Sequence, residues 1–182
     1  SQMGGVVDGT YYYLTQRGTD PISGYTLWAA DADGARELLD GQRFWHLFAA
    51  KDGLVLVDVG CRVDGYCSDQ TRTFWVGDAP HKEFRETMKL VRDAQQAALD
   101  KMRPGLPLHE AYTLARGVFE KAGGEAWFTH GLGHGVGLET HEAPSLGRRG
   151  DKVLQEGMVV TVEPGLYYPQ WGGIRWEYTV LI

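Results

Sequence analysis

Residues 54–76 read LVLVDVGCRVDGYCSDQTRTFWV, and two runs within this stretch predict paired β-strands. The first run, LVLVDV at residues 54–59, is short, continuous and rich in β-branched residues, which is typical of a strand buried on both faces. The second run, at residues 73–76, is aromatic and β-branched, and the pair Asp64-Gly65 between the runs favours a tight hairpin turn. We therefore expect an antiparallel ribbon, with Asp58 as an unexplained carboxylate inside its first strand.

The chain after this ribbon predicts two helices and then further strands. Between residues 80 and 102, apolar side chains recur every three or four positions, which places them on one face of a helix. They are Phe84, Met88, Val91, Ala94, Ala98 and Met102. A second helix is expected over residues 108–122, with Gly123-Gly124 as its stop. The segments MVVTVEPGLYY at 158–168 and GGIRWEYTVLI at 172–182 predict strands, so the order of elements favours an α+β fold with an antiparallel sheet.

Composition limits the classes of function. A length of 182 residues with 43% hydrophobic content suffices for one sizeable core, so one domain is the default. The formal net charge is −6 and no run of like charges stands out, which argues against nucleic acid or an anionic membrane as a partner. No apolar stretch approaches the roughly 20 residues of a membrane span, and no leader segment is evident, so we expect a cytoplasmic protein. Cys61 and Cys67 are expected to be reduced, structural thiols.

Five acidic or imidazole side chains lie in or beside strongly apolar segments. They are Asp58 in LVLVDVG, Asp69 in CSDQTRTF, His134 in GLGHGVG, Glu163 in VVTVEPG and Glu177 in IRWEYTV. Taken singly, each could belong to a turn, a cap or a salt bridge. Together they form an oxygen-rich set suited to Mn²⁺, Co²⁺, Zn²⁺ or Fe²⁺, and they are numerous enough for two ions that share carboxylates. Metal is also favoured because clustered carboxylates without cations would repel one another and raise their own pKa values.

The order of these motifs resembles a known family. The ribbon with its two aspartates is followed by HGLGHGVGLETHEAP at 130–144, VEPGLYY at 162–168 and GGIRWEYTV at 172–180. In order and approximate spacing they resemble the five ligand motifs of the pita-bread metallopeptidases, which include methionine aminopeptidase, Xaa-Pro aminopeptidase and prolidase. The resemblance covers residues 54–182 and implies the pita-bread fold, a curved antiparallel sheet covered by helices.

The same resemblance implies a role for each ligand. Asp58 would chelate one metal ion, Asp69 and Glu177 would bridge both ions, and His134 and Glu163 would complete the other ion. Two divalent ions are implied, with Mn²⁺ or Co²⁺ as the first expectation and Zn²⁺ or Fe²⁺ as alternatives.

Three further side chains match the family pattern. His141, in THEAP, resembles the histidine that hydrogen-bonds the scissile carbonyl, a role that stabilises developing negative charge. His130 opens HGLGH, a form typical of the proline-specific branch, where it helps to bind substrate. Arg175 resembles an arginine that holds the ligating carboxylates in place; the alternative for it is a surface arginine.

The choice of branch rests on a few residues. GYCSDQTRTF, with Thr-Arg-Thr after the second aspartate, and HGLGH resemble Xaa-Pro enzymes more than methionine aminopeptidase. The resemblance implies a peptide substrate with proline in the second position and a bridging water made nucleophilic by two ions. Glu163 would accept the proton of this water and pass it to the leaving nitrogen.

Residues 1–53 depart from the family pattern. Catalytic domains of this family open with a long helix, and a histidine precedes the first aspartate by more than His46 precedes Asp58, so His46 is left out of the site. We expect no counterpart here to the separate N-terminal domain common in Xaa-Pro enzymes. We therefore expect an atypical N-terminal segment at 1–53 and a metallopeptidase core at 54–182, within one domain overall.

Several alternatives remain open from the sequence. The chain could be a methionine-aminopeptidase-like enzyme, or a pita-bread domain that binds peptides or proteins without cleaving them. A metal-free hydrolase similar to creatinase is a third alternative. The complete set of five ligands argues against the last two. A homodimer is a further possibility, since dimers are common among similar enzymes.

Overall fold

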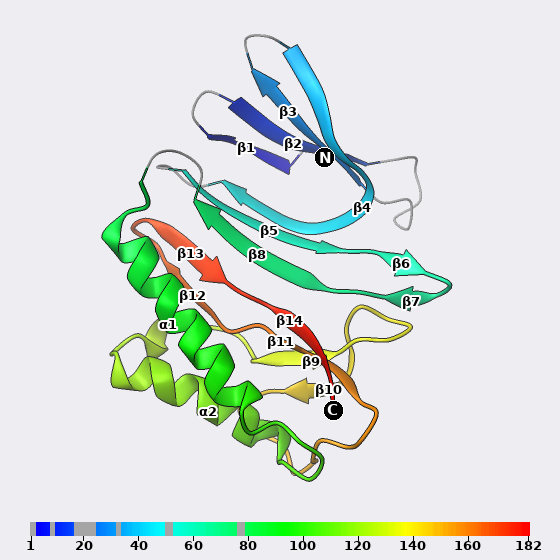
Figure 1. Cartoon of the computed structure of the whole chain (residues 1–182), viewed down its shortest axis with the longest axis vertical. Helices are drawn as coiled ribbons and strands as arrows, with labels where there is room; N and C mark the ends of the chain where they lie inside the picture. The colour runs from blue at the N-terminus through cyan, green and yellow to red at the C-terminus, as the bar shows by residue number, and fades with distance from the viewer. Residues whose placement is uncertain (1–2, 8–9, 17–24, 32–33, 50–52, 76–78) are drawn as a thin grey trace.

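The computed structural model describes residues 3–7, 10–16, 25–31, 34–49, 53–75 and 79–182. For the residues before Gly53, the description is limited to the backbone and its strand pairing. Within these ranges, a run of strands is followed by the helices and then by further strands, as in an α+β protein (Figure 1). The strands are β1 (Met3–Val7), β2 (Thr10–Gln16), β3 (Tyr25–Asp31), β4 (Gly34–Ala49), β5 (Leu54–Gly60), β6 (Arg62–Val63), β7 (Tyr66–Cys67), β8 (Gln70–Trp75), β9 (Gly133–Gly135), β10 (Glu142–Leu146), β11 (Val159–Val162), β12 (Gly165–Tyr168), β13 (Gly172–Arg175) and β14 (Tyr178–Leu181). The helices are α1 (Lys82–Leu99), α2 (Leu108–Lys121) and the short 3-10 helix η1 (Glu125–Trp127).

Six strands form one antiparallel sheet in the order β1-β2-β3-β4-β5-β8. The long strand β4 pairs first with β3 and then, from Arg43 to Ala49, with β5. The sheet is therefore continuous on both sides of the expected boundary at residue 53, and the division into two segments stays a prediction. In the N-terminal part, the aromatic run at 11–14 predicts a strand and lies within β2, whereas the Gly/Pro/Asp-rich stretch at 18–24, which predicts turns, lies outside the described residues.

The predicted ribbon is confirmed as the pair β5 and β8, which are antiparallel. At its tip, β6 and β7 are joined by Asp64 and Gly65, whose φ angles are 50° and 89°. A two-residue turn with positive φ at both central positions matches the right-handed twist of the flanking strands, and this is why Asp-Gly suits it.

The expectation that β5 is buried on both faces is wrong. Burial alternates along the strand: Leu54, Leu56 and Asp58 are buried, whereas the valines between them are half-buried. The reason is that β5 belongs to an antiparallel sheet, and such sheets commonly pack one face on the core and leave the other partly solvated. Asp58 therefore shares the better-buried face with two leucines.

Both predicted helices form close to their expected bounds. On α1, Phe84, Val91, Ala94 and Ala98 are buried as the periodicity predicts, whereas Met102 lies beyond the end of the helix. The α2 helix ends at Lys121, and Gly123 follows with a φ of 68°, the left-handed conformation that glycine adopts without strain.

The C-terminal strands lie between the helices and the ribbon (Figure 1). One four-stranded sheet has the order β10-β9-β11-β14, and β12 pairs with β13 as a hairpin. The α1 helix packs against β11, β12 and β13, and the buried core fills this interface. On the other side, β14 lies beside β8, where the Thr179 hydroxyl donates to the Asp69 carbonyl at 2.9 Å. Within the described ranges, no helix combines the length and apolar character needed to cross a bilayer.

Candidate metal centre

A cavity of about 490 Å³ lies where the ribbon meets the C-terminal strands. Its lining contains all eight side chains that the sequence singled out. They are Asp58, Asp69, His130, His134, His141, Glu163, Arg175 and Glu177. These residues come from segments up to 119 positions apart (177 − 58 = 119), so the fold gathers them.

Three carboxylates meet on the ribbon side of the cavity. Asp58 lies on β5 opposite Thr71 of β8, and Asp69 comes just before β8. Glu177 lies between β13 and β14, and its backbone N–H donates to the Thr71 carbonyl at 3.3 Å. One oxygen from each of the three carboxylates lies within 4.8 Å of the others. All three residues are buried.

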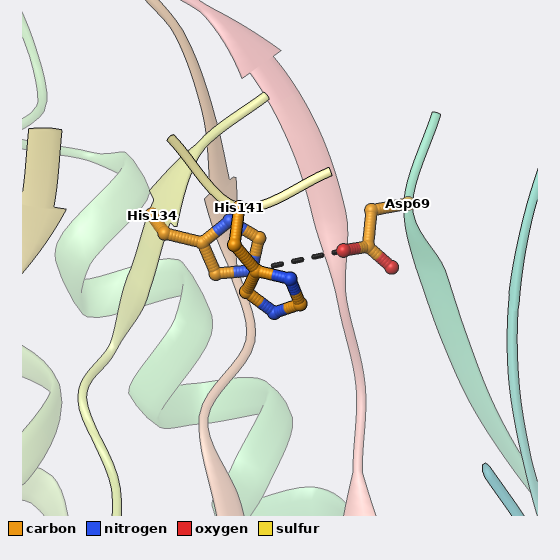
Figure 2. Close-up of side chains that lie close together, drawn as sticks. All are labelled: Asp69, His134 and His141. Carbon is orange, nitrogen blue, oxygen red and sulfur yellow. Dashed lines mark ion pairs between the residues drawn. The ribbon is translucent and has the colours of Figure 1, made fainter. Parts of the chain in front are cut away.

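A second group lies on the β9 side and shares Asp69 (Figure 2). His134 of β9, His141 and Asp69 each offer a ligand atom within 4.8 Å of the others, and the two imidazole ring centres are 4.0 Å apart. The Nε2 atom of His134 lies 3.6 Å from Asp69 Oδ2 and 3.1 Å from Glu163 Oε1. Asp69 is therefore common to both groups, as a carboxylate shared by two ions would be.

The carboxylates of Asp69 and Glu177 have strongly raised pKa values. Burial, with repulsion from Asp58 and Glu163, raises the pKa of Asp69 from 3.8 to about 7. Burial and the charges of Glu163 and Asp69 raise the pKa of Glu177 from 4.5 to about 8. Without a cation, these carboxylates resist full ionisation at neutral pH.

His134 and Glu163 form an ion pair. Burial opposes protonation of His134, but its hydrogen bonds to Glu163 and to the Gly135 carbonyl, together with the charges of Glu163 and Asp69, outweigh burial and raise the pKa of His134 to about 9. Burial likewise opposes ionisation of Glu163, but the hydrogen bond from His134 and the positive charges around it together lower the pKa of Glu163. In the metal-free protein, an imidazolium therefore supplies positive charge beside Glu163 and Asp69.

Arg175, at the end of β13, contacts both sides of the cavity. Its Nη2 donates to Asp58 Oδ2, and its Nε lies 3.7 Å from Glu163 Oε2. The Nε atom also donates to the Thr71 hydroxyl at 3.0 Å, and Nη1 donates to the Tyr167 hydroxyl at 2.9 Å. Burial would favour the neutral form, but Tyr167 and Asp58 together raise the pKa of Arg175 above its ordinary value. Arg175 is thus a permanent charge that is largely, though not fully, buried, and it is not a surface arginine.

His130 is fixed as a neutral imidazole. Its Nδ1 lies 2.6 Å from the Gly131 carbonyl, which can only accept, so Nδ1 carries the proton. Burial lowers the pKa of His130, and Nε2 then accepts from the Tyr167 hydroxyl at 3.0 Å. His130 is therefore connected to Arg175 through Tyr167.

Comparison with known proteins assigns this chain to a family. A family model described as metallopeptidase family M24 matches residues 13–182. The chain belongs to this family. It is 45% identical over 129 residues to the Xaa-Pro dipeptidase of Pyrococcus furiosus, an alignment that covers 71% of this chain and 37% of the relative.

Solved structures agree with the family assignment. The prolidase from Pyrococcus furiosus matches with a TM-score of 0.69 at 45% identity, over 71% of this chain and 38% of that one. The X-Pro aminopeptidase from Thermotoga maritima matches with a TM-score of 0.69 at 37% identity, over 71% of this chain and 36% of that one. The predicted pita-bread fold is therefore confirmed. This chain spans less than two fifths of the length of these relatives.

The cavity residues fit the divalent metal ions that membership of M24 implies. His134 Nδ1 lies 3.0 Å from the Gly135 carbonyl, so Nδ1 holds a proton and Nε2 is the atom left for a metal. Glu177 Oε2 accepts from the Thr71 hydroxyl at 2.7 Å, whereas Oε1 is buried and accepts no hydrogen bond from the described part of the chain. A buried carboxylate oxygen without a donor is costly unless a cation lies beside it.

The sequence analysis gave no role in the site to three side chains that hydrogen-bond the charged groups of the cavity. The Thr71 hydroxyl donates to Glu177 and accepts from Arg175, and the Thr161 hydroxyl donates to Glu163 at 2.9 Å. Tyr167 joins Arg175 to His130. For the two threonines, the sequence signal was two-residue spacing: Thr71 follows Asp69 by two, and Thr161 precedes Glu163 by two. Side chains two positions apart in an extended segment point to the same side.

His46, which the sequence analysis left out of the site, pairs through its backbone with Asp58 on the neighbouring strand β5. Its side chain lies outside the described part of the structure.

Proposed function

We propose that this chain is the catalytic part of a metal-dependent peptidase that hydrolyses the N-terminal Xaa-Pro bond of peptides or dipeptides. The observation that carries the proposal is that four carboxylates, three imidazoles and one largely buried guanidinium converge on one cavity. The names of the relatives, an Xaa-Pro dipeptidase, a prolidase and an X-Pro aminopeptidase, support the substrate class.

The metal centre takes two divalent ions, with Mn²⁺ or Co²⁺ as the first choice. Asp58 would hold one ion, Asp69 and Glu177 would be shared by both, and His134 and Glu163 would hold the other, which is consistent with Asp69 belonging to both ligand groups. When bound, such ions would act as Lewis acids that lower the pKa of water and polarise the substrate carbonyl. Metal binding also removes the protons that Asp69 and His134 hold in the metal-free protein.

The chain's own residues supply the rest of the chemistry. Glu163, whose pKa is lowered, is ionised at neutral pH and accepts the proton of the attacking water, then returns it to the leaving prolyl nitrogen. His141, which is exposed at the cavity, donates a hydrogen bond to the carbonyl oxygen as negative charge develops there. His130 contacts the substrate, and Arg175 offsets the charge of Asp58.

The test is release of the N-terminal residue from Ala-Pro-Ala and Ala-Pro by metal-free protein supplied with Mn²⁺ or Co²⁺. We expect metal-dependent cleavage, and we expect Asp69→Asn to lower kcat/KM by more than about 100-fold, since it weakens a ligand shared by both groups. Asp93→Asn is the matched control, because Asp93 is an exposed carboxylate on α1 that pairs with Lys89.

Three outcomes would contradict the proposal. A folded protein that binds two ions and cleaves neither peptide lacks the proposed activity. Faster cleavage of Met-Ala-Ser than of Ala-Pro-Ala would identify a methionine aminopeptidase instead. Cleavage that persists unchanged in Asp69→Asn would place the chemistry elsewhere.

A further inference from the structure

Gln95 is a buried polar residue on the apolar face of α1. It is 2% exposed and lies beside Val91, Ala94 and Ala98, whose side chains fill the core. Burying an amide that lacks hydrogen bonds costs about 1–3 kcal/mol. Gln95 is not among the residues that line the cavity, so substrate contact does not explain its place.

The amide nitrogen of Gln95 bonds to two backbone carbonyls from separate strands. Nε2 lies 2.7 Å from the Val162 carbonyl and 3.1 Å from the Trp176 carbonyl. Both partners can only accept, so the group that faces them is the NH₂, which has two protons to donate. One side chain thus joins the end of β11 to the connection between β13 and β14.

The two carbonyls belong to the peptide groups that carry two of the proposed ligands. Val162 immediately precedes Glu163, and Trp176 immediately precedes Glu177. At the other end of each peptide group, the N–H is also bonded: Glu163 N–H donates to the Leu132 carbonyl at 2.8 Å, and Glu177 N–H donates to the Thr71 carbonyl at 3.3 Å.

Both peptide groups are therefore held at both ends. The N–H ends are bonded to two different segments, whereas the carbonyl ends share the same nitrogen atom of Gln95. Because a peptide group is planar from one Cα atom to the next, fixing both ends fixes the position of the Cα atom that follows it. Gln95 therefore helps to set the separation of the Glu163 and Glu177 Cα atoms, from which both side chains start.

We infer that Gln95 is a positioning residue for the metal centre: it holds the peptide groups of Glu163 and Glu177 at the spacing that two ions require. The inference rests on the proposed function, because it assigns both glutamates as ligands. It adds a residue on the helix side of the sheet, outside the cavity, to those that determine how tightly the ions bind.

The test is Mn²⁺ titration by calorimetry of the 182-residue chain after removal of metal, with Gln95→Met as the main variant. Methionine matches glutamine in length and lacks branching, but it donates no hydrogen bond. We expect the affinity for at least one ion to fall by about 10–100-fold, as when other partners of metal ligands are lost. The electron paramagnetic resonance spectrum of the Mn²⁺-loaded variant should lose the coupling between two adjacent ions.

Two controls separate positioning from stability. Gln96→Met makes the same change at the next residue, whose amide bonds to Asp100 within the helix region, and we expect wild-type affinity. Val91→Ala removes volume from the same buried face and lowers stability without touching either peptide group, and we expect it to keep wild-type affinity. If Gln95→Met does not fold, Gln95→Asn, which keeps the amide but is one methylene shorter, is measured in its place.

Outcomes for this inference and for the proposed function differ. Wild-type affinity and coupling in a folded Gln95 variant overturn the inference, and so does an equal loss of affinity in Val91→Ala. A wild-type chain that binds two ions but cleaves no Xaa-Pro peptide overturns the activity alone, and the Gln95 comparison still decides the inference. A wild-type chain that binds no Mn²⁺ overturns both.

Discussion

At the scale of single residues, one hydroxyl connects a backbone donor to a charged group of the cavity. Thr161 is fully buried on β11, its Oγ1 accepts from the His134 backbone N–H at 3.0 Å, and it donates to Glu163 Oε1 at 2.9 Å. The carboxylate of Glu163 is thus bonded to the strand that carries His134, through a neutral side chain that does not line the cavity.

Replacing Thr161 by valine should therefore weaken both stability and metal binding. Thr161→Val keeps the shape but leaves the His134 N–H without its acceptor, which costs about 1–3 kcal/mol. Thr161→Ser keeps the hydroxyl and loses only a methyl group, so we expect it to bind Mn²⁺ like the wild type. Urea unfolding and Mn²⁺ titration of both variants measure the two effects. Equal Mn²⁺ affinity in the valine and serine variants would show that the hydroxyl does not position Glu163.

The roles of single residues were predictable only where a motif marks them. Charged residues in apolar segments, such as Asp58 and Glu177, stand out because burying a carboxylate needs a reason. Gln95 gave no such signal, because a glutamine between Ala94 and Gln96 in a helix reads as an ordinary residue. Its partners are backbone carbonyls about 70 to 80 positions later, and helical periodicity identifies a face without identifying what contacts it.

At the scale of elements, the strands beside the cavity approach closely where the chain has glycine. Gly135 of β9 pairs with Glu142 of β10, and a Cβ at position 135 would lie 2.3 Å from the Ala143 carbonyl oxygen. Gly123, beyond α2, has open space around it and a φ of 68°, so its requirement for glycine is conformational.

These two glycines should respond differently to alanine. Gly123→Ala costs about 1–2 kcal/mol, because an L-residue is strained in the left-handed region, and it leaves metal binding intact. Gly135→Ala should cost more than about 3 kcal/mol, since backbone atoms must move, and it should reduce Mn²⁺ affinity because β9 carries His134 and His141 immediately precedes β10. Chemical denaturation and metal titration of the two variants test this contrast. Intact Mn²⁺ affinity in Gly135→Ala would contradict it.

Elements with a strong local signal were predicted well, and burial was not. Both helices follow from apolar spacing, and the hairpin tip follows from Asp64-Gly65, because these signals act within a few residues. The burial of β5 depends on which neighbours cover each face, and a run of valines and leucines does not reveal this. Its alternating burial therefore had to come from the structure.

At the scale of the whole molecule, the cavity exists because the ribbon and the C-terminal strands meet. The motif order of the family indicated which residues would gather, whereas contacts such as Arg175 with Asp58 and Tyr167 required the three-dimensional arrangement. The division of the chain at residue 53, the possible dimer and the cytoplasmic location stay predictions.

The gathered charges make the stability of the whole chain depend on pH. The pKa is raised in the folded protein from 3.8 to about 7 for Asp69, from 4.5 to about 8 for Glu177 and from 6.5 to about 9 for His134. Each group binds its proton more tightly in the folded state than in the unfolded chain. Each contribution to stability is therefore complete below the unfolded pKa and is lost as the pH rises through the folded value. The metal-free protein should have a Tm that falls between pH 7 and pH 9.

Bound Mn²⁺ should counteract this fall in Tm with rising pH, because the ions replace the protons as the source of positive charge in the cavity. Mn²⁺ affinity then rises with pH, and binding releases protons that calorimetry in buffers of different ionisation enthalpy can count. At about 100 times its Kd, an ion adds about 2.7 kcal/mol, which corresponds to roughly 5–10 °C in Tm for a chain of this length. The gap in Tm between Mn²⁺-loaded and EDTA-treated protein should therefore widen from pH 7 to pH 9. A Tm in EDTA that rises over this range, or a gap that narrows, would show that the clustered carboxylates and His134 are not where the metal exchanges with protons.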